Sequence, residues 1–217
     1  MFAVLIFNVQ LALASVCSTP QNTFVGSALH PSRWRSESLK QRYMAHINST
    51  RSRMLPSWTA ACTTRNCKRE AKVWGQAQYA FAKAAVRYQA DPANYWFLYF
   101  EDDAILVDSC PHYCMPEPVT VQCQFVSLDC RGSNNIRPYT TIGHYRQSRS
   151  RYGYGTAGFW FTGAFAVRML SIANDRAYPV DLVIFEHAQT WKDVCWLDCL
   201  SHRCVVGHND DAKLRIW

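Results

Sequence analysis

Three consecutive acidic residues, Glu101-Asp102-Asp103, have the clearest capacity for chemistry in this chain. Adjacent carboxylates repel one another, so such a cluster is stabilised when it binds a cation, and hard divalent cations prefer oxygen ligands. The triplet therefore predicts a Mn²⁺ or Mg²⁺ site, where the metal would neutralise the negative charge that develops on a leaving diphosphate. A solvated turn after a strand is the structural alternative.

The acids directly follow the apolar run Tyr95-Trp96-Phe97-Leu98-Tyr99-Phe100. A continuous apolar run of this length is typical of a strand that is buried on both faces, as in a parallel sheet. Open α/β sheets bind their ligands outside the carboxyl ends of their strands. The sequence thus places the triplet where such a sheet would hold a ligand.

Helices and strands alternate along the rest of the chain, which predicts a single α/β layered domain. The clearest helix covers 68–89, where apolar residues recur at helical spacing and Pro92 follows the end. Two more helices are expected, over 33–47 and over 164–173, the second with Thr162 as its N-cap. Further strands are predicted over 23–29, 55–60 and 119–128, a turn and a short strand over 155–161, and loops over 108–118 and 131–154.

Four segments, in order, are similar to the motifs of one known family. Phe97 to Ala104 resembles a Leu-Glu-Asp-Asp core, and Phe125 to Leu128 resembles the strand that follows it. Gly155 to Phe161, with the helical segment after it, resembles a Gly-Thr-x-x-Tyr segment, and Tyr178 to Asp181 resembles a Pro-Val-Asp motif. These segments together resemble glycosyltransferase family 25, which includes lipooligosaccharide and procollagen galactosyltransferases.

The resemblance implies a GT-A-like (Rossmann-like) layered domain over 23–217, with a mostly parallel central sheet and helices on both faces. It also implies an inverting hexosyltransferase that moves a sugar, for instance galactose, from a UDP-sugar to a hydroxyl of a glycan or protein acceptor. By the same resemblance, Asp102 and Asp103 would bind Mn²⁺ or Mg²⁺ and the diphosphate, with Glu101 alongside. Gly155 and Thr156 would contact the donor.

Asp181 and His208 are two further candidates, each with a structural alternative. An inverting transfer needs a base that takes the proton of the acceptor hydroxyl, and Asp181 after Pro179-Val180 would fill that role. Alternatively, Asp181 is an N-cap, and the apolar segment 182–185 begins a helix instead of forming a strand. His208 would join the metal site, since imidazole is a common ligand, or would lie in a polar loop after a last strand.

The segment 131–154 is polar and basic, and it contains His144, Arg146, Arg149 and Arg151. Arginine matches the geometry of phosphate, so these side chains could meet a diphosphate. A solvated basic loop is the alternative. The formal net charge of +7 weakly favours an anionic ligand such as a nucleotide. No basic run is dense enough to indicate a nucleic-acid partner.

Ten cysteines in 217 residues indicate disulfides and an oxidising compartment. The alternative is zinc, with ligands drawn from Cys110, Cys114, Cys195, Cys199, His202 and Cys204. The apolar residues 1–16 are too short for a stable membrane span. They are expected to be a signal peptide, or else a first core strand over 2–9, and the sequon Asn48-Ser49-Thr50 agrees with the secretory pathway or secretion.

Two other functions compete with the transferase. The first is a catalytically inactive, secreted, disulfide-rich binding protein with the same fold. The second is a glycoside hydrolase, in which paired carboxylates such as Glu101 and Asp181 would act without metal or nucleotide.

Overall fold

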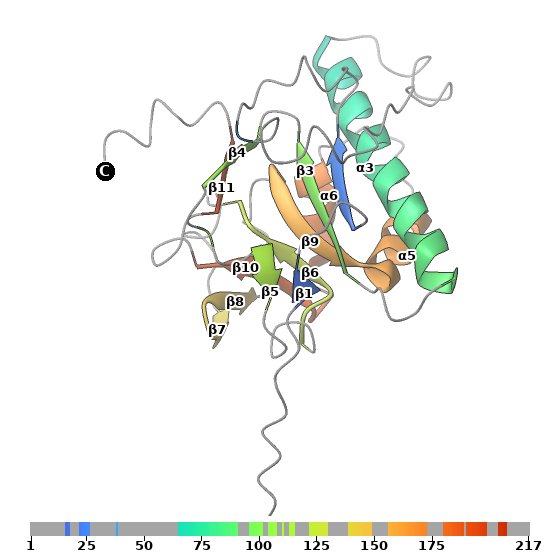
Figure 1. Ribbon diagram of the computed structural model, residues 1–217. Helices are drawn as coiled ribbons and strands as arrows, with labels where there is room; N and C mark the ends of the chain where they lie inside the picture. Colours follow the sequence, from blue (N-terminus) through green and yellow to red (C-terminus); the bar gives the residue numbers. More distant parts are fainter. Residues whose placement is uncertain are drawn as a thin grey trace, which may run out of the picture.

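The computed structural model describes residues 16–17, 22–26, 38, 65–90, 96–101, 104–107, 110, 113–115, 122–129, 139–148, 156–172, 180–188, 190–198 and 204–207. Within them the chain is an α/β protein built on a seven-stranded sheet (Figure 1). The strands follow the spatial order β2 (Thr23–Gly26), β3 (Trp96–Glu101), β9 (Gly158–Thr162), β6 (Phe125–Ser127), β10 (Val194–Leu197), β8 (Tyr145–Ser148) and β7 (Tyr139–Ile142).

The sheet is mixed rather than mostly parallel. Two neighbouring pairs are parallel, β2 with β3 and β6 with β10, and the other pairs in this sheet are antiparallel. The expectation of a mostly parallel sheet fails because β9 lies antiparallel between β3 and β6. The strands β2, β3, β6 and β10 nevertheless point the same way, so they end at one edge of the sheet, which we call the carboxyl edge.

Strand β3 is buried on both faces, as its apolar run predicts. Phe97 and Tyr99 belong to a cluster with the helices, whereas Leu98 and Phe100 belong to a second cluster on the other face. This alternation follows from the two-residue period of a strand. The predicted strand 23–29 is confirmed over its described residues as β2, and within 122–128, the described part of the predicted strand 119–128, the strand is β6.

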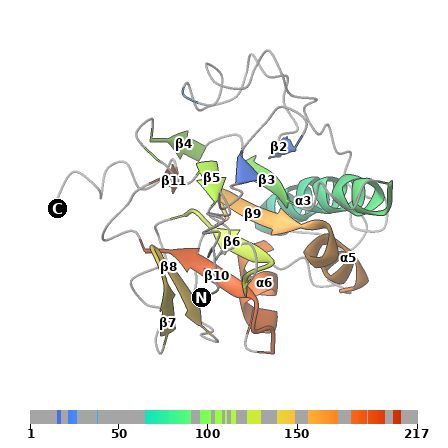
Figure 2. The ribbon, with the colours of Figure 1, turned by 60° about the horizontal axis from the view of Figure 1, so that its bottom comes forward.

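Three helices pack on the first face of the sheet: α3 (Arg65–Ala90), α5 (Gly163–Ser171) and α6 (Val180–Ala188) (Figure 2). The predicted helices 68–89 and 164–173 are confirmed as α3 and α5. The hydroxyl of Thr162 accepts a hydrogen bond from the Phe165 backbone N–H at 3.0 Å, which confirms the predicted N-cap. The segment 182–185 lies within α6, so it is a helix and not a strand.

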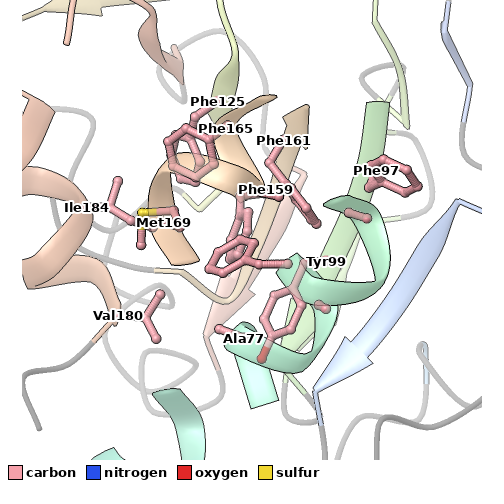
Figure 3. Close-up of a cluster of buried hydrophobic side chains, with 14 of the residues drawn as sticks. Ala77, Phe97, Tyr99, Phe125, Phe159, Phe161, Phe165, Met169, Val180 and Ile184 are labelled. Atoms are coloured by element: carbon pink, nitrogen blue, oxygen red, sulfur yellow. The ribbon is translucent and has the colours of Figure 1, made fainter. Parts of the chain in front are cut away.

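Aromatic rings fill the space between this face and the helices (Figure 3). The rings of Tyr99 and Phe159 stack at 4.8 Å between centroids, and Phe125 lies 5.0 Å from Phe165 of α5. Such pairs contribute about 0.5–1.5 kcal/mol each beyond the burial of their area. The packing of β3, β6 and β9 against α5 therefore fixes the central strands that lead to the carboxyl edge.

The second face is covered partly by short strands. Strand β4 (Ala104–Leu106) pairs antiparallel with β11 (Val205–Gly207), and Figure 2 shows both on the side of the sheet away from α3 and α5. The helices α3, α5 and α6 all lie on the first face, so the described ranges do not confirm the expected helices on both faces. Ser38 is the one residue of the predicted helix 33–47 that the structure describes. It is helical, and its hydroxyl accepts a hydrogen bond from the Leu106 N–H at 2.9 Å.

Among the described residues, three disulfides tie distant parts of the chain together: Cys17–Cys114, Cys110–Cys204 and Cys123–Cys195. These pairs use four of the cysteines that the zinc alternative required, so that alternative is wrong for Cys110, Cys114, Cys195 and Cys204. Disulfides of this kind are typical of a protein that folds in an oxidising compartment. The first of them joins β1 (Val16–Cys17) to β5 (Cys114–Met115). Strand β5 lies inside the predicted loop 108–118.

The amino-terminal predictions lie almost wholly outside the described residues. Val16, the last residue of the predicted signal peptide, pairs with Met115. The remainder of that segment, the strand 55–60 and the sequon at Asn48 are not described. Among the helices that the structure does describe, none is long and apolar enough to cross a membrane.

Part of the predicted loop 131–154 is a β-hairpin. Strands β7 and β8 pair antiparallel, with Ile142 opposite Tyr145. The two-residue turn between them contains Gly143 at φ 56°, a conformation that hairpin turns require and glycine adopts without strain. The sequence prediction of a loop is therefore wrong over 139–148, because polar and basic side chains hid a short hairpin.

Gly158 at the start of β9 is packed so closely that it has no room for a side chain. A Cβ there would lie 2.8 Å from Val205 Cγ2 and 3.0 Å from Phe100 Cδ1. We expect Gly158→Ala to lower the free energy of unfolding by about 1–3 kcal/mol, the usual cost of overpacking. Urea denaturation of Gly158→Ala, Val205→Ala and the double variant measures this, and a double variant no more stable than the sum of the two single effects would contradict the close contact.

Candidate functional site

Acidic residues follow three of the strands that end at the carboxyl edge. Glu101 is the last residue of β3, Asp129 lies two residues after β6, and Asp198 directly follows β10. Strand β9 runs the other way, so its first residues begin at the same edge. Glu101 of the acidic triplet and Thr156 of the glycine-threonine segment, which are 55 positions apart in sequence, are therefore brought together here.

Glu101 and Thr156 are in direct contact. The Thr156 hydroxyl donates a hydrogen bond to Glu101 Oε1 at 2.9 Å, and the Glu101 backbone N–H donates to the Ala157 carbonyl at 3.0 Å. The hydroxyl fixes one carboxylate oxygen of Glu101, while Thr156 itself is buried. Two residues that the sequence analysis assigned to the same site thus meet, although the resemblance implied a different contact for Thr156.

The remaining predicted ligands lie outside the described residues. These are Asp102, Asp103, Gly155 and His208. Their immediate neighbours are described: Gly207 lies opposite Ala104 in the pairing of β11 with β4. Among the described residues no group of three or more His, Cys, Asp or Glu side chains could hold a metal ion, and the acidic triplet itself is represented there by Glu101 alone.

Asp129 is a further acidic residue at the carboxyl edge, and the sequence analysis did not identify it. Its side chain is 1% exposed, and its Oδ2 accepts a hydrogen bond from the Ala157 backbone N–H at 3.0 Å. The signal was available, since Asp129 follows the mostly apolar segment Phe125 to Leu128 much as Glu101 follows its own apolar run. A single acid after a short strand was not distinctive enough to stand out.

Asp181 lies in the first turn of α6. Its Oδ1 accepts a hydrogen bond from the Leu182 backbone N–H at 2.9 Å. A carboxylate at a helix N-terminus is stabilised by the helix dipole, so the structure gives Asp181 a role at the start of α6. Its role as the base of a transfer reaction stays a prediction.

Arg146 links β8 to the residue that follows β10 at the carboxyl edge. Its guanidinium is buried and pairs with Asp198 at 2.9 Å, and the Asp198 backbone N–H donates to the His144 carbonyl at 2.8 Å. Nearby, burial raises the pKa of the Tyr145 hydroxyl. The ion pair joins β8 to the end of β10, which gives Arg146 a structural role that the prediction of a diphosphate ligand did not include.

Comparisons with models of known protein families and with curated protein sequences find no match to this chain. The resemblance to glycosyltransferase family 25 therefore depends on the quoted motifs alone.

Proposed function

We propose that this protein is a metal-dependent glycosyltransferase with a GT-A-like domain, which moves a sugar from a UDP-sugar to a hydroxyl of a glycan or protein. The observation that carries the proposal is the position of Glu101. It ends a buried strand at the carboxyl edge, where its carboxylate is held by Thr156 of the glycine-threonine segment. Ligands of open α/β sheets bind at this kind of edge.

The residue types of the acidic triplet suit a divalent cation. Carboxylate oxygens are the ligands that Mn²⁺ and Mg²⁺ prefer, and Asp102 and Asp103 directly follow the anchored Glu101 in the chain. When bound, the metal would stabilise the charge of the leaving diphosphate. Asp102 and Asp103 are the proposed ligands, with Glu101 alongside.

The pairing of β4 with β11 supports His208 as a third ligand. Gly207 is opposite Ala104, His208 follows Gly207, and Asp103 precedes Ala104. Consecutive Cα atoms are 3.8 Å apart. Asp103 and His208 are therefore each one residue away from the facing pair Ala104 and Gly207. The proposal thus draws its ligands from two segments that the fold joins.

Asp181 is the proposed base. The acceptor hydroxyl would give its proton to the Asp181 carboxylate while its oxygen attacks the anomeric carbon of the donor. The bond from that carbon to the diphosphate oxygen breaks, UDP leaves, and the configuration at carbon inverts.

Release of UDP tests this proposal. The purified protein is incubated with a panel of UDP-sugars and with glycan or peptide acceptors, once with Mn²⁺ and once with EDTA. We expect UDP release from at least one donor with Mn²⁺, and none with EDTA. Binding of UDP without release would favour the inactive binding protein, and metal-independent hydrolysis of a glycoside would favour the hydrolase; either result overturns the transferase.

A further inference from the structure

We infer that Asp129 is a positioning residue for the acidic triplet, and this inference rests on the proposed metal site. Burying a carboxyl group is costly unless hydrogen bonds compensate it. Asp129 is nearly fully buried, and its Oδ2 accepts the Ala157 N–H at 3.0 Å. A buried acid at the end of β6 therefore acts on the segment that begins β9.

That segment carries the effect from Asp129 to Glu101. Ala157 uses both of its backbone groups: its N–H donates to Asp129, and its carbonyl accepts from the Glu101 N–H at 3.0 Å. The preceding residue, Thr156, donates its hydroxyl to the Glu101 carboxylate at 2.9 Å. Two consecutive residues thus link the acid after β6 to the acid that ends β3.

Asp129 also meets the strand that leads to His208. Its backbone forms a parallel bridge with Val205 of β11, and Val205 packs directly over Gly158. Asp129 is therefore linked to Glu101 through Ala157, and its backbone is paired with Val205, in the strand that precedes His208. Partners behind the ligands of a metal site typically change metal affinity 10–100-fold when they are removed.

Titration calorimetry with Mn²⁺ alone tests the inference without any turnover. We expect Asp129→Ala to weaken Mn²⁺ affinity by about 10-fold or more. Asp129→Asn keeps an oxygen that can accept the Ala157 N–H, so its loss should be smaller. Wild-type affinity in a folded Asp129→Ala protein, or equal losses in both variants, would overturn the inference.

A matched pair of threonines keeps the test decisive if Asp129→Ala does not fold. Thr156 lies two residues before β9 and Thr162 is the last residue of β9, and the two are similarly buried, at 4% and 7% exposed. Thr156→Val removes the hydroxyl that holds Glu101, whereas Thr162→Val removes the N-cap of α5 at the other edge. We expect weaker Mn²⁺ binding only in Thr156→Val.

The outcomes separate this inference from the proposed function. Equal Mn²⁺ affinity in the two threonine variants overturns the positioning route through Thr156. Absence of Mn²⁺ binding by the unchanged protein overturns both the inference and the metal site. Mn²⁺ binding that depends on Asp129, in a protein that releases no UDP from any donor, supports the inference and overturns only the transferase.

Discussion

Asp103→Ala is expected to lower Mn²⁺-dependent UDP release by about 10³-fold. The proposed metal would stabilise the charge of the leaving diphosphate, an interaction that contributes several kcal/mol in metal-dependent enzymes. A loss of about 4 kcal/mol corresponds to a factor of about 10³ in rate. The measurement is the initial rate of UDP release at saturating donor, with Mn²⁺ varied.

Glu186→Ala is the matched control, because Glu186 is an exposed acid on α6 away from its first turn. It should release UDP at the rate of the unchanged protein. Asp181→Ala tests the base: a loss much smaller than that of Asp103→Ala would weaken the assignment of proton transfer to Asp181. Undiminished release by Asp103→Ala would contradict the metal site itself.

Removal of the Cys110–Cys204 disulfide should produce a large loss of stability. The two residues are 94 positions apart in sequence, and the chain-entropy description gives about 4.5 kcal/mol for a loop of that size. The bond is buried, and the adjacent Tyr113 hydroxyl donates to the Cys204 carbonyl at 2.9 Å. We expect Cys110→Ala with Cys204→Ala to lower the free energy of unfolding by about this amount in urea denaturation.

The Cys123–Cys195 disulfide provides the comparison. Its residues are 72 positions apart, so the same description gives nearly the same loss of stability. Only the first pair holds the start of β11, which lies against Asp129 and Gly158. We therefore expect Mn²⁺ binding to weaken when Cys110–Cys204 is removed but not when Cys123–Cys195 is removed, measured under conditions where both variants remain folded. Equal Mn²⁺ binding by the two variants would mean that β11 does not support the site.

Long segments with a strong hydrophobic period were predictable from the sequence. The helical stripe of α3 and the N-cap Thr162 of α5 were found because their signals are local. The apolar run of β3 was also found, since burial on both faces leaves no polar residue inside the strand. Short apolar runs were ambiguous: 182–185 has the composition of a buried strand, and only its tertiary packing in α6 decides for a helix.

Pairing between distant segments was not predictable. The direction of β9 depends on its contacts with β3 and β6 on either side, and nothing in 158–162 alone encodes that direction. The role of Asp129 is of the same kind, because it depends on Ala157 lying beside it. The contact of Thr156 with Glu101 was likewise hidden, although both residues had been assigned to one site.

The pairing of β4 with β11 constrains the length of the acidic motif as well as its chemistry. Two residues separate the end of β3 at Glu101 from the start of β4 at Ala104. Loss or gain of one residue in this link would shift β4 by one position against β11 and exchange its inward and outward side chains. Ala104 and Leu106, which are buried, would then turn outward in place of Ile105. Insertions and deletions in this link should therefore be eliminated for a structural reason, separate from the proposed chemistry that limits substitutions at Asp102 and Asp103.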